Sequence, residues 1–247
     1  MKNLVQADVT RILKKPGLVI AMGLALAVSL IVAVHTRMKV WDGFHFVTGQ
    51  RDIGELVLAV FGIMIFLSVY ADEFSANSMQ CLIGRGITRL KLLAAKCIDC
   101  FIVTAICSGI YTIWILALGL IFGAHLNRIE LSFLCIQMLV GAVRMFGFAV
   151  IAMIVLYSTK NVSLATAFNV FLAIAFDLML TGLNKIPVIK FAHLENSFFS
   201  GAVNCAGIDM QLTGASAAVA ILCELLKVVI LSLGLTYILF RKKELDF

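Results

Sequence analysis

Two long stretches without any charged side chain constrain the fold of this chain more than any other feature. Pro16–Thr36 and Cys100–Asn127 contain no Asp, Glu, Lys or Arg. An α-helix needs about 20 apolar residues to cross a hydrocarbon core of roughly 30 Å, and both stretches are long enough. The chain is only 14% charged, whereas soluble domains are about 25% charged. We therefore expect an all-α integral membrane protein.

The hydropathy pattern predicts one domain, residues 1–247, with six transmembrane helices. Their limits are about 17–35, 54–71, 98–122, 131–157, 162–183 and 215–240. The first stretch is too long for the hydrophobic region of a signal peptide, and further spans follow it. We expect it to remain as the first span.

The distribution of Lys and Arg predicts the orientation. With the N-terminus inside, 12 of them fall on the cytoplasmic side and six on the outer side. Because cytoplasmic loops are enriched in Lys and Arg, we expect both termini in the cytoplasm and a multi-pass protein of the cell membrane. The net charge of +6 then reflects this topology and contact with anionic lipid, and nothing indicates nucleic-acid binding.

Residues 1–16 have the pattern of an amphipathic helix at the inner interface. Apolar residues recur at helical spacing, with basic and polar residues between them; they are Leu4, Val5, Val9, Ile12 and Leu13. Such a helix lies in the plane of the interface. Pro16-Gly17 follows it and predicts a break before the first span.

Residues 72–96, the coupling region, lie between the second and third predicted spans. The sequence predicts a short helix ending at Gly84, then a second helix capped by Thr88 that continues without a breaker to Phe122. That second helix would be roughly 50 Å long, and the membrane needs only about 30 Å. Its first turns therefore project into the cytoplasm, where they suit contact with a cytoplasmic partner.

The longest outer connection covers residues 184–214. It contains Pro187, Gly201, Gly207 and several aromatic residues. Short helices in the outer interface and a segment that dips partway into the membrane both fit this composition.

Four ionisable residues fall well inside predicted spans: Arg144, Asp177, Glu224 and Lys227. A charge at mid-bilayer costs at least about 2.5–3.5 kcal/mol, so these groups should face protein or water. Glu224 and Lys227 are three apart and share a helix face, where they can pair. The four residues either pair structurally between helices or line a substrate path. Asp99 lies near a span end, where we expect water to reach it.

The motifs of several enzyme classes are absent. The sequence has no Gly-x-x-x-x-Gly-Lys-Ser/Thr loop for phosphates and no His-Glu-x-x-His metal motif. Its four histidines are irregularly spaced, and most of its cysteines lie in or beside apolar runs. We expect no catalytic residues, no metal and no cofactor in this chain.

These features together resemble the ABC-2 type permeases, the membrane subunits of type V ABC exporters. The match rests on the basic amphipathic opening that ends in Lys14-Lys15-Pro16, on the Asp72–Lys96 segment, and on the basic ending Phe240–Phe247. In the second of these, Asn77-Ser78 stands where the family often has Gly-Thr.

The resemblance implies that a short cytoplasmic helix docks on a separate P-loop ATPase, which holds the ATP and Mg²⁺. The residues to which it assigns this role are Glu73, Phe74, Asn77, Leu82, Gly84, Arg85 and Arg89. It also implies a dimer with a second copy or a related permease, and a bacterial membrane. An ordinary solvated basic loop is the alternative interpretation of the region.

Three functions stay open at this point. The first is an export permease for a peptide or amphipathic small molecule, similar to those of antimicrobial-peptide export and immunity. The second is an ion-coupled secondary transporter that uses the intramembrane charges, although no inverted repeat is visible. The third is an intramembrane enzyme, for which the sequence offers no nucleophile and base.

Overall fold

The computed structural model describes residues 2–39, 42–71, 88–176, 198–213 and 215–242, together with Met179 and Gly182. All regular elements in these ranges are helices, and the same ranges contain no strand. The predicted all-α class is therefore confirmed. Residues 72–87, which are most of the coupling region, lie outside the described residues, and so do residues 184–197 of the 184–214 connection.

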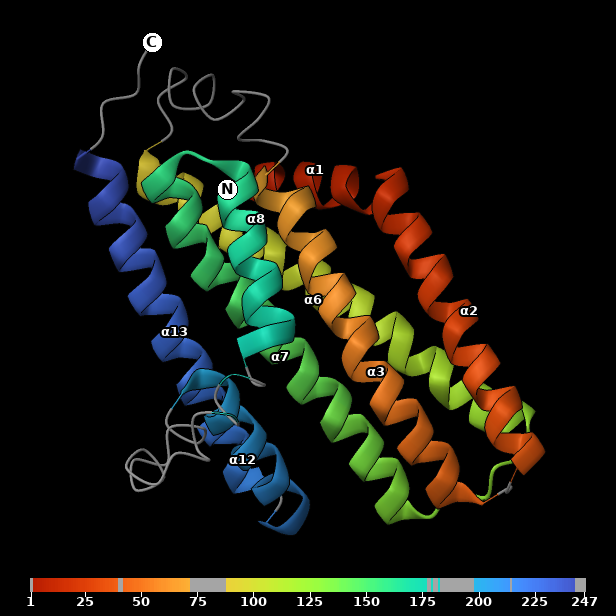
Figure 1. Cartoon of the computed structure of the whole chain (residues 1–247). Helices are drawn as coiled ribbons and strands as arrows, with labels where there is room; N and C mark the ends of the chain where they lie inside the picture. Colours follow the sequence, from red (N-terminus) through yellow and green to blue (C-terminus); the bar gives the residue numbers. More distant parts are fainter. Residues whose placement is uncertain are drawn as a thin grey trace.

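The helices of the described ranges are arranged side by side in one bundle (Figure 1). They are α1 (Lys2–Leu13), α2 (Pro16–Lys39), α3 (Gly43–Phe66) with the π-helix η1 (Leu67–Ala71), α6 (Arg89–Ile121), α7 (Arg128–Thr159), α8 (Val162–Val170) with the π-helix η2 (Phe171–Ala175), α12 (Phe199–Thr213) and α13 (Ala215–Lys242).

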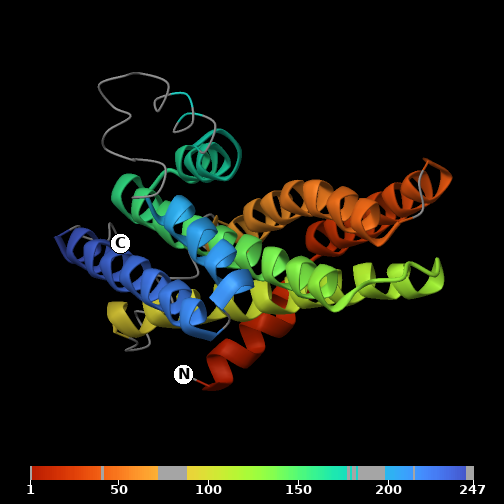
Figure 2. The same ribbon diagram turned by 90° about the horizontal axis from the view of Figure 1, so that it is seen from below.

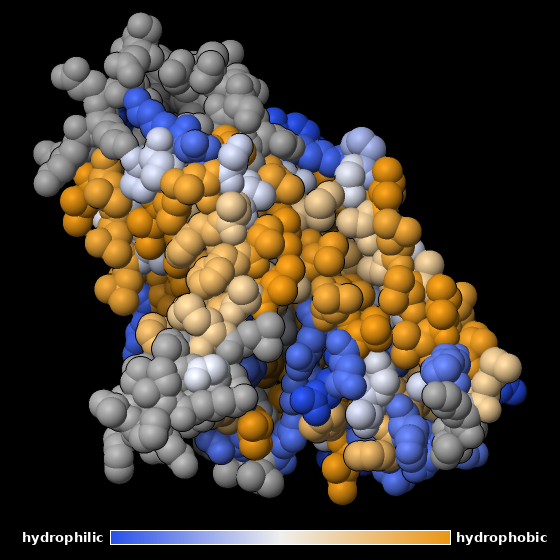
Figure 3. Space-filling model, viewed as in Figure 1, coloured by the Kyte–Doolittle hydropathy of each residue, from blue (hydrophilic) through white to orange (hydrophobic). Residues whose placement is uncertain are grey.

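Five helices in the described ranges are long and apolar enough to cross a membrane. They are Pro16–Met38, Gly43–Tyr70, Arg89–Ile121, Arg128–Thr159 and Ala217–Leu239. Residues Val162–Ala175 form a shorter apolar helix, and most of residues 177–183 at the end of the predicted fifth span fall outside the described residues. The surface has a hydrophobic band with more polar regions towards both ends of the bundle (Figure 3). This is the surface of a multi-pass membrane protein.

Helix α7 is the centre of the bundle. It packs against α3, α6, α8, α12 and α13, while α2 packs on α3 and α6. Helices α2 and α3 lie on one side of α7, and α12 and α13 on the other (Figure 2). Helix α1 crosses one end of the bundle (Figure 1), which we call the α1 end.

The predicted helix boundaries around α6 and α7 are confirmed, with different capping details. Helix α6 begins directly after Thr88, whose backbone is extended but whose side chain makes no capping hydrogen bond. Helix α7 begins after Asn127, whose backbone N–H donates to Glu130 Oε2 at 2.8 Å. Lys160 ends α7 with φ of 56°. Helix α2 begins at Pro16, where a missing backbone N–H costs nothing.

The second predicted span was too short at its start. Residue 54 is the predicted beginning, but α3 already begins at Gly43. The charged residues in this stretch misled the hydropathy argument, because Arg51 and Glu55 are partly exposed on the helix surface and pair there. Arg51 pairs with Glu55 at 3.9 Å, and its guanidinium lies 5.8 Å from the centre of the Phe133 ring on α7.

Helix α12 is the described part of the 184–214 connection. It lies beside the middle of α7 and not over its end. A Cβ added to Gly147 would meet Phe199 at 2.1 Å, and one added to Gly207 would meet Val140 at 2.5 Å. These close approaches mean that α12 runs antiparallel to α7 and reaches the middle of the bundle.

Candidate functional site

The most unusual feature of the described structure is a group of charges buried at the α1 end. Lys96 Nζ lies 2.5 Å from Asp8 Oδ2 and 3.5 Å from Asp99 Oδ2. Lys96 and Asp99 are fully buried on α6, and the side chain of Asp8 on α1 is only 15% exposed. Arg11 reaches Asp8 Oδ1 at 3.5 Å from the exposed face of α1. We call these four residues the α1–α6 charge cluster.

Two acids and two bases make this cluster neutral as a whole. Charges taken out of water are costly unless they are paired with good geometry. The short contact between Lys96 and Asp8 meets that condition and joins two helices. Its main effect is to fix α1 on the first turns of α6.

Apolar packing strengthens the same junction. Ile12 on α1 and Leu92, Leu93 and Ala95 on α6 are all completely buried. Burying one side chain such as Ile12 contributes about 1.5–3 kcal/mol. Helix α1 is therefore an integral layer of the bundle at this end and not a loosely attached segment.

A second contact ties the start of α2 to the end of α3. Lys15 Nζ donates to the backbone carbonyl of Ser68 in η1 at 2.6 Å. The last carbonyls of a helix have no partner within the helix, and a cation is favoured there. The chain enters the undescribed part of the coupling region just after η1 and leaves it at Thr88. Both ends of that segment are thus held beside α1.

The sequence argument missed the cluster. It counted Lys96 among the bases on the cytoplasmic side without foreseeing that its side chain is buried. It also expected water to reach Asp99, which is wrong because Asp99 is fully buried. Two signals were present. Lys96 and Asp99 are three residues apart on one helix, and Asp8 falls on the same face of the predicted amphipathic helix as Ile12.

Of the residues assigned to ATPase coupling, only Arg89 is described; it is the first residue of α6 and is half-buried. Glu73, Phe74, Asn77, Leu82, Gly84 and Arg85 lie outside the described residues. Their roles stay predictions.

The structure places the described intramembrane charges on two different helices. Arg144 on α7 has Nη1 at 3.4 Å from Asn204 Oδ1 on α12. Glu224 and Lys227 on α13 pair as their spacing predicts, at 2.6 Å. Asp177 lies outside the described residues.

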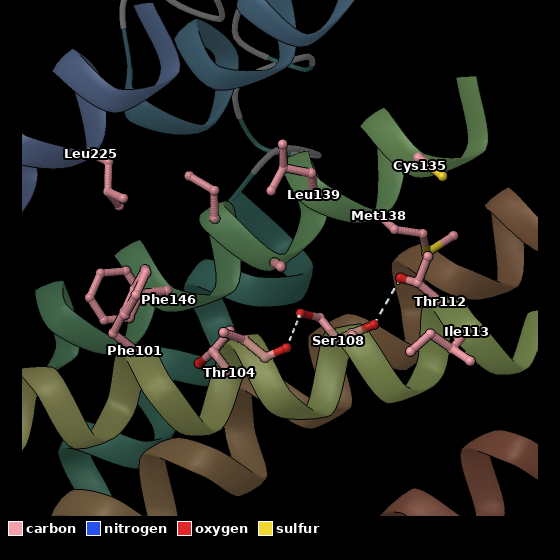
Figure 4. Close-up of a pocket in the computed structure, with 14 residues that line it drawn as sticks. Phe101, Thr104, Ser108, Thr112, Ile113, Cys135, Met138, Leu139, Phe146 and Leu225 are labelled. Atoms are coloured by element: carbon pink, nitrogen blue, oxygen red, sulfur yellow. Dashed lines mark hydrogen bonds between the residues drawn. The ribbon is translucent and has the colours of Figure 1, made fainter. Parts of the chain in front are cut away.

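A cavity of about 430 Å³ lies between α6, α7 and α13 (Figure 4). Thr104, Ser108 and Thr112 line it along α6, but their hydroxyls donate to carbonyls of their own helix. Phe101 and Phe146, with ring centres 5.4 Å apart, line another part of it. Because its hydroxyls are already bonded, the cavity suits an apolar group such as a hydrocarbon chain.

The described residues contain no group of three or more His, Cys, Asp and Glu side chains able to hold a metal ion. The cysteines in these ranges are free thiols.

Comparison with known proteins gives a family but no activity. No curated protein matches the chain significantly. A family model described as "Protein of unknown function (DUF2705)" matches residues 12–245. The match covers nearly all of the described helices, so the chain belongs to the DUF2705 family.

Proposed function

We propose that this protein is the membrane-spanning permease subunit of an ATP-driven ABC exporter. It moves a peptide or an amphipathic small molecule outward, while a separate P-loop subunit binds ATP and Mg²⁺ and hydrolyses the ATP. The observation that carries this proposal is that α6 packs against α1 through buried residues from Leu92 onward and continues as one helix to Ile121.

The length of α6 supports this role. Its 33 residues correspond to about 50 Å, of which the hydrocarbon core takes about 30 Å. The excess suits a lever that begins at Thr88, the end of the coupling region. A displacement of that region by a docked ATPase would pass along α6, because the α1–α6 charge cluster prevents its first turns from bending independently.

The topology proposed for the exporter has six spans. Five are the long apolar helices, and α8 with η2 begins the remaining one. In this proposal the α1 end faces the cytoplasm, both termini lie there, and the membrane is the bacterial cell membrane. The N-terminal helix α1 lies in the inner interface, and the Lys and Arg distribution supports that orientation.

The cavity between α6, α7 and α13 supports an amphipathic substrate. Its lining is apolar, and α6 forms one wall of it. Movement of α6 would change the shape of this cavity. The hydrocarbon part of a substrate can therefore occupy it in one state of the lever and leave it in the other.

The test is co-purification of the tagged chain from its native membrane with P-loop ATPases identified by mass spectrometry. We expect the parent chain to retain an ATPase, and Glu73→Ala and Arg85→Glu to lose it. Arg128→Glu is a matched charge reversal at the exposed start of α7, at the opposite end of the bundle, and should retain the ATPase. Absence of any ATPase with the parent, or equal loss in all three variants, contradicts the proposal.

An ion-coupled transporter is the second candidate, and the buried Lys96–Asp99 pair favours it. Buried ionisable groups in membrane helices often mark ion pathways. This candidate predicts that the purified chain alone, in liposomes containing a pH-sensitive dye, dissipates an imposed pH gradient. Asp99→Asn should abolish that activity. The exporter proposal predicts no difference from empty liposomes.

A further inference from the structure

An ion pair lies on the outer face of α13 at the depth of the membrane centre. The candidate span Ala217–Leu239 has residue 228 at its middle. Lys227 is one residue and Glu224 four residues from that point, so both lie within about 6 Å of it along the helix axis. The Lys227 side chain is nevertheless 63% exposed and that of Glu224 29% exposed.

The two faces of α13 differ clearly. The buried face packs on α7 and α12 and includes Ile221, Leu225, Ser232 and Thr236. Lys227 lies on the opposite side of the helix, because two residues from Leu225 is a rotation of about 200°. Helix α13 is also at the edge of the bundle in both views (Figures 1 and 2).

Hydrocarbon is a poor environment for this face. A charged side chain at the centre of a membrane helix costs about 2.5–3.5 kcal/mol, and such residues normally face protein or water. The pairing of Glu224 with Lys227 reduces that cost, but it leaves three-fifths of the lysine side chain exposed. Another protein surface that offers opposite charges at the same depth would complete the pair.

We propose that a second copy of this chain covers the outer face of α13, with the two α13 helices parallel around a two-fold axis along the membrane normal. In such an interface residue i of one copy contacts residue j of the other, and j contacts i. Lys227 of each copy then meets Glu224 of the other. Two intrachain pairs become a closed ring of four alternating charges.

The remaining residues of this face fit close helix approach. Ala220, Cys223 and Gly234 are exposed and small, and they flank the ion pair at helical spacing. A Cβ added to Gly234 would meet no atom within 4 Å, so space is open there for a partner. Small residues at membrane-helix interfaces let backbones approach each other and increase van der Waals contact.

This inference deepens the proposed permease function and rests on it, because it names the partner and the helix that join the two halves of the exporter. It goes beyond a general expectation of dimers because it names the helix and the ion pair that form the contact. It assigns the pairing to one ion pair whose charges can be exchanged between copies.

Charge exchange between differently tagged copies tests the ring of charges. Lys227→Glu gives a face with two acids, and Glu224→Lys gives a face with two bases, so neither variant keeps an intrachain pair. Two differently tagged copies of the same variant should co-purify at least about tenfold less than two tagged copies of the parent. The reason is that like charges in contact cost several kcal/mol. Co-expression of the two variants should restore recovery between them. The proposal is overturned if the two variants co-purify with each other no better than each variant does with itself.

Native cysteines give a second test that leaves all charges unchanged. In a chain whose only cysteine is Cys223, two-fold α13 pairing places the two thiols opposite each other. Iodine, which partitions into the bilayer, should then oxidise the two thiols to a disulfide, being itself reduced to iodide, and give a product of twice 26.9 kDa. A chain whose only cysteine is Cys135, exposed on α7, is the matched control and should give about tenfold less product.

The outcomes separate this inference from the proposed function. Absence of the Cys223 product, or a product with a protein of different mass, overturns α13 pairing between copies. An ATPase that still co-purifies leaves the exporter proposal standing. Conversely, a Cys223 dimer without any ATPase supports the interface and contradicts the exporter.

Discussion

The α1–α6 charge cluster makes Lys96 the most sensitive single position in the described structure. Lys96→Met keeps the length of the side chain but removes the ammonium group that meets Asp8 at 2.5 Å and Asp99 at 3.5 Å. Removing one partner of a buried ion pair costs about 3–5 kcal/mol, because the other charge stays buried. For a chain of 247 residues, 1 kcal/mol corresponds to about 2–4 °C. The melting midpoint should therefore fall by about 6–20 °C.

A fluorogenic maleimide that reacts with newly exposed thiols measures this midpoint in detergent. Cys97 and Cys100 are buried next to Lys96, so unfolding of this junction produces the signal. Lys91→Met is the control, since Lys91 is exposed on the same helix and such changes cost at most about 0.5 kcal/mol.

A second variant checks the electrostatic explanation. Lys96→Met combined with Asp99→Leu removes the two fully buried charges and leaves Asp8 paired with Arg11 at 3.5 Å. Replacing a buried pair by apolar residues is often neutral or stabilising. The double variant should recover most of the lost midpoint. If Lys96→Met melts within about 2 °C of the parent, or if the double variant is less stable than the single one, the reasoning about this cluster is wrong.

Three further predictions concern packing and accessibility. Gly147→Ala should destabilise the bundle by about 1–3 kcal/mol, because its Cβ would lie 2.1 Å from a ring carbon of α12; Gly23→Ala, with nothing within 4 Å, should not lower the midpoint, and equal effects would contradict this packing. Lys15→Met should cost about 1.5–3 kcal/mol, because the donor to the η1 carbonyl is lost; the same thermal assay measures it, and an unchanged midpoint speaks against that contact. In single-cysteine chains, Cys135 should react with maleimide in the native state and Cys107 only after unfolding, since only the latter is buried; equal labelling rates by mass spectrometry would refute this difference.

The sequence predicts the long apolar helices well because their physics is local. The limits predicted for the helix from Thr88 to Phe122 agree with α6, since a run without Pro or Gly breakers at its start continues as helix. The Glu224–Lys227 contact also follows from spacing along one helix.

The contacts between distant segments were much harder to predict. Asp8 and Lys96 are 88 positions apart, and no local pattern says that α1 folds back over α6. The depth of α12 depends on a gap at Gly147 into which Phe199 fits. Both features arise from packing between helices, which hydropathy along the chain does not encode.

ATP turnover by the purified complex tests the central claim of an ATP-driven permease most directly. The tagged chain is extracted from its native membrane into lipid nanodiscs, and ATP hydrolysis is measured beside empty nanodiscs and the Arg85→Glu variant. The account predicts hydrolysis that accompanies the parent chain and falls to the level of empty nanodiscs with Arg85→Glu, while Arg128→Glu retains it. A parent chain that remains intact in nanodiscs but carries neither an ATPase polypeptide nor ATP hydrolysis above empty nanodiscs would contradict the account.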